Sequence, residues 1–411
     1  MKKGLIILAS LLLGATWLQA RTWVMCQGCP EGEMNQLIEK CNDGDTILVS
    51  GGRYEGGPYH INKSIQILGN GTPVFVGAGN HEIFVLQSDG IRIEGVQVEN
   101  VRPNYLKDLA AIRVEKVRAT VIRDVRIIRS FFGIYLEHCN GATIESNFIS
   151  GDASDEASSG NAIHAWYCKN LLIRDNEMSN HRDGIYFEFV DSSEIKNNYS
   201  HQNLRYGLHF MFSNDDLYQS NTFVENGAGV AVMFSKRIAM YSNIFRHNWG
   251  SASYGLLLKE IYDGDIRDNV FKENSIGIHV EGSSRIKYFA NEFVRNGWAI
   301  RMTGGCMENE IRGNNFYSNT LDLLMHGRVN DNNFDENYWS GYNGYDLNHD
   351  GIGDVPYRPV KLFSFLIDRT PESMILLRSL FVDLLNFAEK VSPIFTPAQV
   401  LDNKPLMKPL S

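Results

Sequence analysis

The chain has 411 residues and carries 39 basic against 48 acidic side chains, a formal net charge of −9. This acidic balance excludes binding to a nucleic-acid phosphate backbone as the main role of the protein. Because 43% of the residues are hydrophobic, a sizeable core can form and wholesale disorder is excluded.

The first twenty residues have the three parts of a secretory signal. Lys2 and Lys3 give a basic start, an apolar run covers 4–13, and Ala20 is the small residue before the cleavage point. The apolar run is too short to span a bilayer, and no later stretch reaches the ~18 residues that a spanning helix needs. We therefore expect cleavage after Ala20 and export of a periplasmic protein; a retained membrane anchor is the alternative.

Residues 21–44 are predicted to form an N-terminal cap that contains Cys26, Cys29 and Cys41. Six cysteines fit an oxidising compartment but are too few for a disulfide scaffold. We expect a disulfide within this trio, and a metal or redox role of the Cys-x-x-Cys pair is the alternative.

A repeat occupies residues 45–345. The pattern Asn-x-(Phe/Tyr) recurs, and the five steps from Asn197 to Asn314 average 23.4 residues. A ladder of glycines, including Gly184 and Gly207, runs in phase with it, and each glycine opens a short apolar strand. This period is too short for the ~34-residue helical repeats and too long for a heptad. Three short strands and three turns fit it, so the sequence predicts an all-β, right-handed parallel β-helix of about a dozen coils.

Asparagine suits the turn of such a coil for two reasons. It tolerates left-handed backbone geometry, and its amide can bond to the same amide on the next coil. We expect the aromatic residue that follows it to fill the interior.

Segment 346–371 is predicted to be a second cap and a linker. Its loop places oxygen ligands at positions 1, 3, 5 and 9 of an EF-hand pattern, with the Ile352 carbonyl at position 7. Position 12 is Tyr357 where a Glu is expected, so the cage is incomplete. Bound Ca²⁺ is the expected state, and an ion-free cluster of Asx turns is the alternative. The predicted ligands are Asp346, Asn348, Asp350, Ile352 and Asp354.

The last segment, 372–411, is predicted to be one helix over 372–391 and a proline-rich extended tail. The helix either packs on the end of the β-helix or docks on a membrane partner. The apolar residues that we predict for partner contact are Met374, Leu377, Phe381 and Leu384.

Alternation along the strands places one metal-binding combination on the outer surface. Met211 and Met233 occupy the same outward position of successive coils, ~4.8 Å apart, and His209 lies ~6.7 Å along the strand from Met211. Two thioethers and an imidazole suit Cu(I) and suit Mg²⁺ or Ca²⁺ poorly. Plain apolar contacts under a loop or at a partner interface are the alternative.

Cys139 and Cys168 occupy equivalent positions of adjacent coils. They are expected to stack, either as a disulfide or as two buried thiols, and we assign them a structural role.

Parallel β-helices also host polysaccharide chemistry. The runs 214–216 (NDD) and 285–287 (RIK) match fragments of the polygalacturonase signature, but the Gly-His-Gly element between them is missing. A secreted polysaccharide-active lyase, epimerase or hydrolase is therefore the alternative function. A structural clamp that never touches metal is a third.

Several runs of the sequence closely resemble the NosD family of periplasmic copper-binding proteins, which act in nitrous oxide reductase maturation. These runs are 182–187 (RDGIYF), 204–216 (LRYGLHFMFSNDD), 229–236 (GVAVMFSK), 337–341 (NYWSG), 357–361 (YRPVK) and 368–373 (DRTPES). The resemblance implies a non-enzymatic assembly factor that joins an ABC-type transporter of a membrane permease and an ATPase.

The resemblance also implies the cargo and its route. Such proteins accept copper from a lipoprotein chaperone and pass it to apo nitrous oxide reductase for its copper–sulfur centre. This chain has no Gly-x-x-x-x-Gly-Lys-(Ser/Thr) loop, so ATP is expected to be hydrolysed by the partner. The C-terminal helix becomes the candidate contact with the permease, which would give peripheral membrane association.

Overall fold

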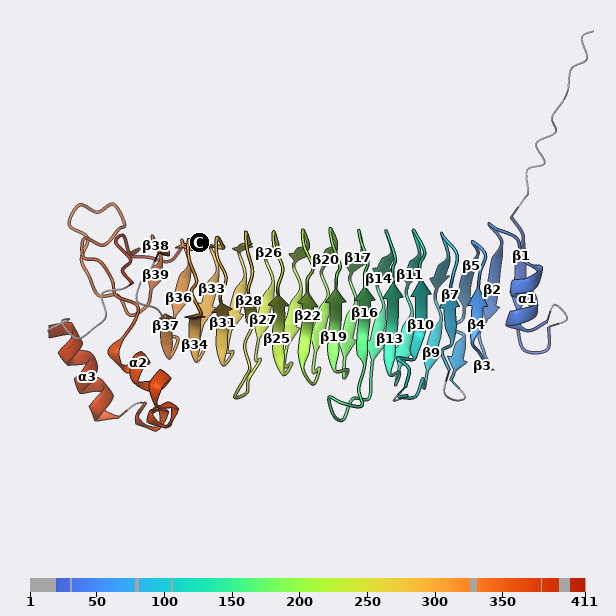
Figure 1. The fold of residues 1–411 in the computed structure, drawn as a ribbon, viewed down its shortest axis with the longest axis horizontal. Coiled ribbons are helices and arrows are strands. Elements are labelled where there is room, and N and C mark those ends of the chain that lie inside the picture. Colours follow the sequence, from blue (N-terminus) through green and yellow to red (C-terminus); the bar gives the residue numbers. More distant parts are fainter. Residues whose placement is uncertain are drawn as a thin grey trace, which may run out of the picture.

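The computed structural model describes residues 20–29, 32–77, 81–104, 106–325, 331–377, 379–391 and 400–410. The predicted signal peptide, apart from Ala20, lies outside these residues. The described chain winds into a parallel β-solenoid of about 13 turns, drawn horizontally in Figure 1, with helices at its C-terminal end. This confirms the predicted all-β parallel β-helix.

Within the described residues the strands form three parallel sheets, and each complete coil contributes one strand to each sheet. Sheet 1 consists of β1 (Thr22–Met25), β2 (Thr46–Ser50), β5 (Gln66–Asn70), β8 (Arg92–Glu94), β11 (Val121–Arg123), β14 (Thr143–Glu145), β17 (Leu172–Arg174), β20 (Glu194–Lys196), β23 (Leu217–Gln219), β26 (Ala239–Tyr241), β29 (Asp265–Arg267), β32 (Lys287–Phe289), β35 (Glu310–Arg312) and β38 (Asn333–Asp335). Sheet 2 consists of β4 (Tyr59–Ile61), β7 (Phe84–Leu86), β10 (Ala110–Glu115), β13 (Phe132–Glu137), β16 (Asn161–Trp166), β19 (Asp183–Glu188), β22 (Tyr206–Met211), β25 (Ala228–Met233), β28 (Leu256–Lys259), β31 (Ile276–Glu281), β34 (Trp298–Thr303) and β37 (Leu321–Met325). Sheet 3 consists of β3 (Arg53–Glu55), β6 (Val74–Val76), β9 (Gln97–Glu99), β12 (Arg126–Ile128), β15 (Phe148–Ser150), β18 (Glu177–Ser179), β21 (Tyr199–His201), β24 (Thr222–Val224), β27 (Ile244–Arg246), β30 (Val270–Lys272), β33 (Glu292–Val294), β36 (Asn315–Tyr317) and β39 (Tyr338–Trp339).

The interior is filled by side chains that repeat from coil to coil. In sheet 3, the aromatic residue predicted to face inward does so, and the rings of successive coils stack with centroids 4.1 to 5.4 Å apart. This buried stack fixes the register of the coils through continuous apolar contact. Its members are Phe223, Phe245, Phe271, Phe293, Phe316 and Trp339.

A buried asparagine ladder follows one corner of the solenoid. For example, the Asn221 Oδ1 atom accepts hydrogen bonds from the backbone N–H and the side-chain Nδ2 of Asn198, both at 3.0 Å. The predicted amide ladder therefore exists, with two corrections to its members. Asn198 occupies the position that the pattern assigned to Asn197. Asn332, which also starts an Asn-x-Phe run, belongs to a neighbouring ladder with Asn309.

The left-handed backbone geometry expected of the ladder asparagines belongs to the residue before each of them. Ser220, which precedes Asn221, has φ 55°, and Asn197, which precedes Asn198, has φ 54°. One residue therefore turns the chain, and the next is free to aim its amide along the solenoid axis.

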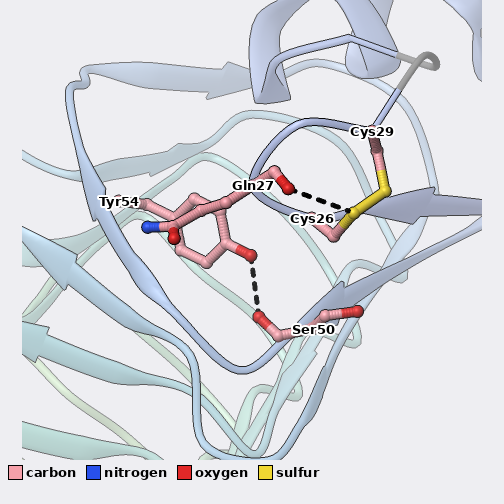
Figure 2. Close-up of a disulfide and its surroundings, with 5 residues drawn as sticks. All are labelled: Cys26, Gln27, Cys29, Ser50 and Tyr54. Atoms are coloured by element: carbon pink, nitrogen blue, oxygen red, sulfur yellow. Dashed lines mark hydrogen bonds between the residues drawn. A yellow bond between two sulfur atoms is a disulfide. The ribbon is translucent and has the colours of Figure 1, made fainter.

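The N-terminal end is covered by α1 (Met34–Lys40), which buries Met34 and Leu37. Cys26 and Cys29 form a disulfide beside it, and Figure 2 shows the neighbouring Tyr54, whose hydroxyl donates to the Ser50 carbonyl at 2.8 Å. The third cysteine of this segment, Cys41, is a buried free thiol. Burial is the main cause that raises the pKa of Cys41 to about 11.

The C-terminal region differs from the single helix expected over 372–391. It contains α2 (Leu362–Arg369), a 3₁₀ helix, η1 (Pro371–Leu376), and α3 (Leu380–Val391). The break arises because Leu377 leaves the helical region of the backbone, with φ −52° and ψ 132°. Phe363, Ile367 and Val382 then pack against the outer face of the last strands of sheet 2. No helix in the described part of the chain is long and apolar enough to cross a membrane.

Candidate functional site

The outer face of sheet 2 presents continuous columns of side chains because its strands are paired in register. One column contains His164, Tyr186, His209, Ala231, Leu257 and His279, and the next contains Trp166, Glu188, Met211, Met233, Lys259 and Glu281. The residues between these positions, such as Leu208 and Phe210, are fully buried in the interior. The predicted copper ligands therefore lie on one face.

Met211 and Met233 are direct partners on the adjacent strands β22 and β25. Both side chains are half-buried, and Met233 packs against a small apolar cluster that includes Ala231, Tyr254 and Leu257. Two thioethers at the spacing of neighbouring strands can face one soft metal ion from the same side.

His209 is more enclosed than the sequence suggested, since only 4% of it is exposed. Its ring lies against those of Tyr186 and Tyr206, with centroids 5.1 and 4.8 Å away. Tyr254, from the connection before β28, reaches within 3.4 Å of the Tyr206 hydroxyl and helps to close this face. The expectation that all three donors are open to solvent is therefore wrong for the imidazole.

Within the described chain, both ring nitrogens of His209 are buried without a protein partner. Neither Nδ1 nor Nε2 has a hydrogen-bond partner among the described residues. Burial, followed by the charges of Arg205 and Arg182, lowers the pKa of His209 to about 3, so the imidazole is neutral near pH 7. A neutral ring with an unpaired nitrogen beside two thioethers fits the donor set that Cu(I) prefers.

The other common metal-binding side chains are not clustered in the same way. Among the residues that the structure describes, no three His, Cys, Asp or Glu side chains are grouped so that they could hold a metal ion.

The predicted calcium loop forms a compact set of turns. The Asp346 carboxylate accepts from the backbone N–H groups of Asp350 and Gly351 at 3.3 and 2.9 Å. Asp350 accepts from the N–H of Ile352, and Asp354 accepts from the N–H of Leu347. These bonds have the pattern of Asx turns, and they engage the carboxylates that calcium would need, together with Asn348, whose amide donates to Asp350.

Cys139 and Cys168 stack in adjacent coils, as the spacing suggested, but both are free buried thiols. The backbone N–H of Cys139 lies 3.4 Å from the Cys168 sulfur, and both thiols donate to backbone carbonyls. The hydrogen bond with Cys139, together with burial, raises the pKa of the Cys168 thiol. The pair therefore contributes to the core.

The four residues predicted for partner contact do not share one environment. Met374, Phe381 and Leu384 are exposed, whereas Leu377 packs against the apolar cluster under α2. The four predicted contact residues leave out three further exposed apolar side chains of this segment, Ile375, Leu380 and Phe387. In α3 the i, i+4 and i+7 spacing of Leu380, Leu384 and Phe387 was the available signal.

The residues that matched fragments of a hydrolase signature do not form one site. Asp215 pairs with Arg237, while Asp216 is buried and accepts from the Ser193 N–H. Arg285 lies three coils away from Asp215 and pairs with Asp263. These acidic and basic groups have structural partners of their own.

The chain has clear relatives. Residues 147–344 match the family model described as NosD, periplasmic copper-binding protein. A protein of Pseudomonas aeruginosa named probable ABC transporter binding protein NosD is 29% identical over 386 residues, which is 89% of each chain. The protein of the same name from Stutzerimonas stutzeri is 33% identical over 112 residues, 26% of each chain.

Solved structures share the fold at much lower identity. An alginate lyase superimposes with a TM-score of 0.59 at 12% identity, over 77% of this chain and 85% of the lyase. A DFA-IIIase from Arthrobacter chlorophenolicus gives a TM-score of 0.58 at 12% identity, over 76% of this chain and 98% of the enzyme. These likenesses concern the solenoid architecture alone.

Proposed function

Because this chain belongs to the NosD family, we propose that it is the periplasmic copper-binding component of an ABC-type transporter. It accepts Cu(I) at His209, Met211 and Met233 and supports assembly of the copper–sulfur centre of nitrous oxide reductase. The protein is an assembly factor, and its partner ATPase hydrolyses ATP.

One observation carries the proposal: Met211 and Met233 are in-register partners on β22 and β25, and His209 lies on β22 with Met211, on the same face of the sheet. Thioether sulfur and neutral imidazole are soft or borderline donors that favour a monovalent copper ion. The unpartnered ring nitrogens of His209 support the assignment, because a buried polar atom without a partner is costly unless a ligand satisfies it.

The proposed partners are a membrane permease, a protein that delivers copper and a protein that receives it. The exposed apolar side chains of the C-terminal helices, including Phe381 and Leu384, are the proposed contact with the membrane permease. A copper chaperone lipoprotein delivers the ion, and apo nitrous oxide reductase receives it. The relatives named as ABC transporter binding proteins support the transporter association.

The test is an anaerobic Cu(I) titration against a competing chromophoric chelator. We expect one tight site in the wild type and a loss of at least about tenfold in affinity, or about 1.4 kcal/mol, for Met211→Leu/Met233→Leu. Leucine preserves the apolar volume, so the fold is retained. Met407→Leu, a half-buried methionine in the C-terminal tail, is the matched control and should bind like wild type. Equal binding by the double variant would overturn the site.

A further inference from the structure

Cys26 and Cys29 differ from the other cysteines of the chain in exposure and in oxidation state. All six cysteines lie within the described residues, and four of them are buried free thiols. These four are Cys41, Cys139, Cys168 and Cys306. The other two are half-buried, joined as a disulfide, and lie on the loop between β1 and α1 (Figure 2). Reagents and ions in solution therefore reach this pair far more readily than the buried thiols.

The turn that carries the pair keeps the two cysteines together without help from the sulfur–sulfur bond. Their Cα atoms are 5.2 Å apart, and the Cys29 backbone N–H donates to the Cys26 carbonyl at 3.2 Å. Gly28 supplies the left-handed backbone geometry of the turn, with φ 80°. The Gln27 side-chain amide donates to the Arg53 carbonyl at 2.9 Å and ties the turn to β3. We therefore expect both sulfurs to stay within reach of one ion when the disulfide is reduced.

The N-terminal cap has other contacts that hold it in place. The two cysteines are 3 positions apart, and a cross-link stabilises a protein less when the loop that it closes is short. The Asp45 carboxylate accepts from the Arg21 N–H at 2.7 Å and from the Trp23 indole at 3.2 Å, which joins β1 to the start of β2. The Lys63 ammonium donates to three backbone carbonyls around the end of α1. The disulfide can therefore open while the cap remains folded.

Two neighbouring thiolates are a donor set that favours Cu(I). Thiolate sulfur is a soft ligand that selects Cu(I) over Mg²⁺, Ca²⁺ and Mn²⁺. Zn²⁺ also binds cysteine, but its structural sites use four protein ligands. Among the residues that the structure describes, no third His, Cys, Asp or Glu joins the pair in a group that could hold a metal ion. The pair therefore suits Cu(I), whose coordination two sulfur ligands can complete.

We propose that Cys26 and Cys29 form a second Cu(I) site, which is open when the pair is reduced and closed when it is a disulfide. A dithiol reductant transfers two electrons and two protons to the disulfide, which becomes two thiols while the reductant becomes a disulfide. Cu(I) then displaces both thiol protons and binds between the two thiolates. The disulfide has no thiolate to offer, so the oxidised pair holds no ion. This site does not depend on the one at Met211 and Met233.

The experiment is an anaerobic Cu(I) titration of the full-length mature protein against a competing chromophoric chelator. It is done on the oxidised protein, and again after reduction with dithiothreitol and removal of the reagent. We expect the reduced protein to bind about one equivalent of Cu(I) more than the oxidised protein. Cys26→Ser/Cys29→Ser should bind the same amount of Cu(I) before and after the treatment.

Cys41→Ala is the matched control, because Cys41 is the buried thiol of the same cap, and it should keep the gain on reduction. Met211→Leu/Met233→Leu should also keep the gain, so that failure of either copper site is distinguishable from failure of the other. X-ray absorption of this methionine variant, reduced and loaded with Cu(I), should show sulfur ligands without nitrogen.

Thermal melting should confirm that the reduced wild type and every variant are folded. Three results would contradict the proposal: no gain in Cu(I) on reduction, an equal gain in Cys26→Ser/Cys29→Ser, or loss of the gain in the methionine variant. Weak binding by the oxidised wild type would count against the site at Met211 and Met233 and would leave the gain on reduction as the measure of the cysteine site.

Discussion

The carboxylate of Asp402 completes the asparagine ladder at Asn337, although the two residues are 65 positions apart. Its Oδ2 atom accepts from the backbone N–H and the Nδ2 of Asn337, both at 3.1 Å, and from the Trp339 indole at 2.8 Å. Segment 400–410 therefore returns to the open end of the solenoid, where Asp402 pairs with Phe334 and Leu406 pairs with Tyr338. The part of the predicted tail that the structure describes is a cap.

Asp402→Ala should destabilise the protein by about 2–3 kcal/mol, because it leaves buried donors of Asn337 and Trp339 unpaired. Asp402→Asn is the control, since an amide oxygen can accept the same bonds, and it should stay close to wild type. Urea unfolding followed by tryptophan fluorescence measures both. If the alanine variant unfolds at the wild-type urea concentration, the tail does not secure the ladder.

Glu145 joins three successive coils of sheet 1 through ion pairs with Arg123 and Arg174. Burial alone would raise the pKa of Glu145, but the hydrogen bonds from Arg174 and Arg123 outweigh burial and hold it below its usual value. A depressed pKa in the folded state means that this stabilisation is present above the unfolded pKa of ~4.3 and is lost as the pH falls through the folded value.

Glu145→Gln should therefore lower stability at pH 7 by about 1–2 kcal/mol, a figure reduced because both arginines are partly exposed to solvent. Thermal melts of both proteins between pH 7 and pH 3 should converge as the pH falls below about 4. A difference in melting temperature that does not change with pH would contradict the ion-pair explanation.

Tyr254 helps to cover His209 through its contact with Tyr206. It should therefore affect the rate at which copper reaches the site more than the affinity of the site for copper. We expect Tyr254→Ala to speed Cu(I) uptake in anaerobic stopped-flow measurements and to leave the equilibrium affinity within about threefold. Tyr262→Ala, an exposed tyrosine in the connection that follows β28, is the control and should leave the uptake rate unchanged. Slower uptake by Tyr254→Ala would argue against a covering role.

The exposed apolar side chains of α3 should determine attachment to the permease. Phe381→Glu/Leu384→Glu should abolish co-purification with the membrane components, because charged groups cannot enter an apolar interface without a large desolvation cost. Phe289→Glu, at an exposed aromatic residue of sheet 1, should co-purify normally. Both variants should melt like wild type, and retained co-purification of the α3 variant would place the contact elsewhere.

Most of the solenoid could be predicted from the sequence, because its coils are nearly equal in length and in the type of residue at each position. A fixed period lets Gly184 and Gly207 assign faces, so the partnership of Met211 with Met233 follows from counting. The burial of His209 did not follow from counting, since Tyr254 belongs to a connection outside the repeat. Its only trace in the sequence is the longer step of 26 residues from Asn243 to Asn269, compared with 22 from Asn221 to Asn243.

The C-terminal helices were harder to predict because contacts with the solenoid determine where they break. Apolar residues from Met374 to Ala388 share one helical pattern, yet the backbone breaks at Leu377 so that Val382 can reach the last strands while Phe381 stays outside. Tertiary packing determines this break, and local helix propensity does not predict it. The return of Asp402 to Asn337 is equally invisible in the sequence, because it joins a tail to a repeat of different composition.

The register of sheet 2 makes the solenoid a molecular ruler with divisions of ~4.8 Å. Duplicating one whole coil between β22 and β25 would move the two sulfur atoms apart by a single division and keep both on the same side. Donor spacing in such a protein can therefore be changed only in discrete steps, which gives evolution and protein engineering a graded series of sites on an unchanged scaffold.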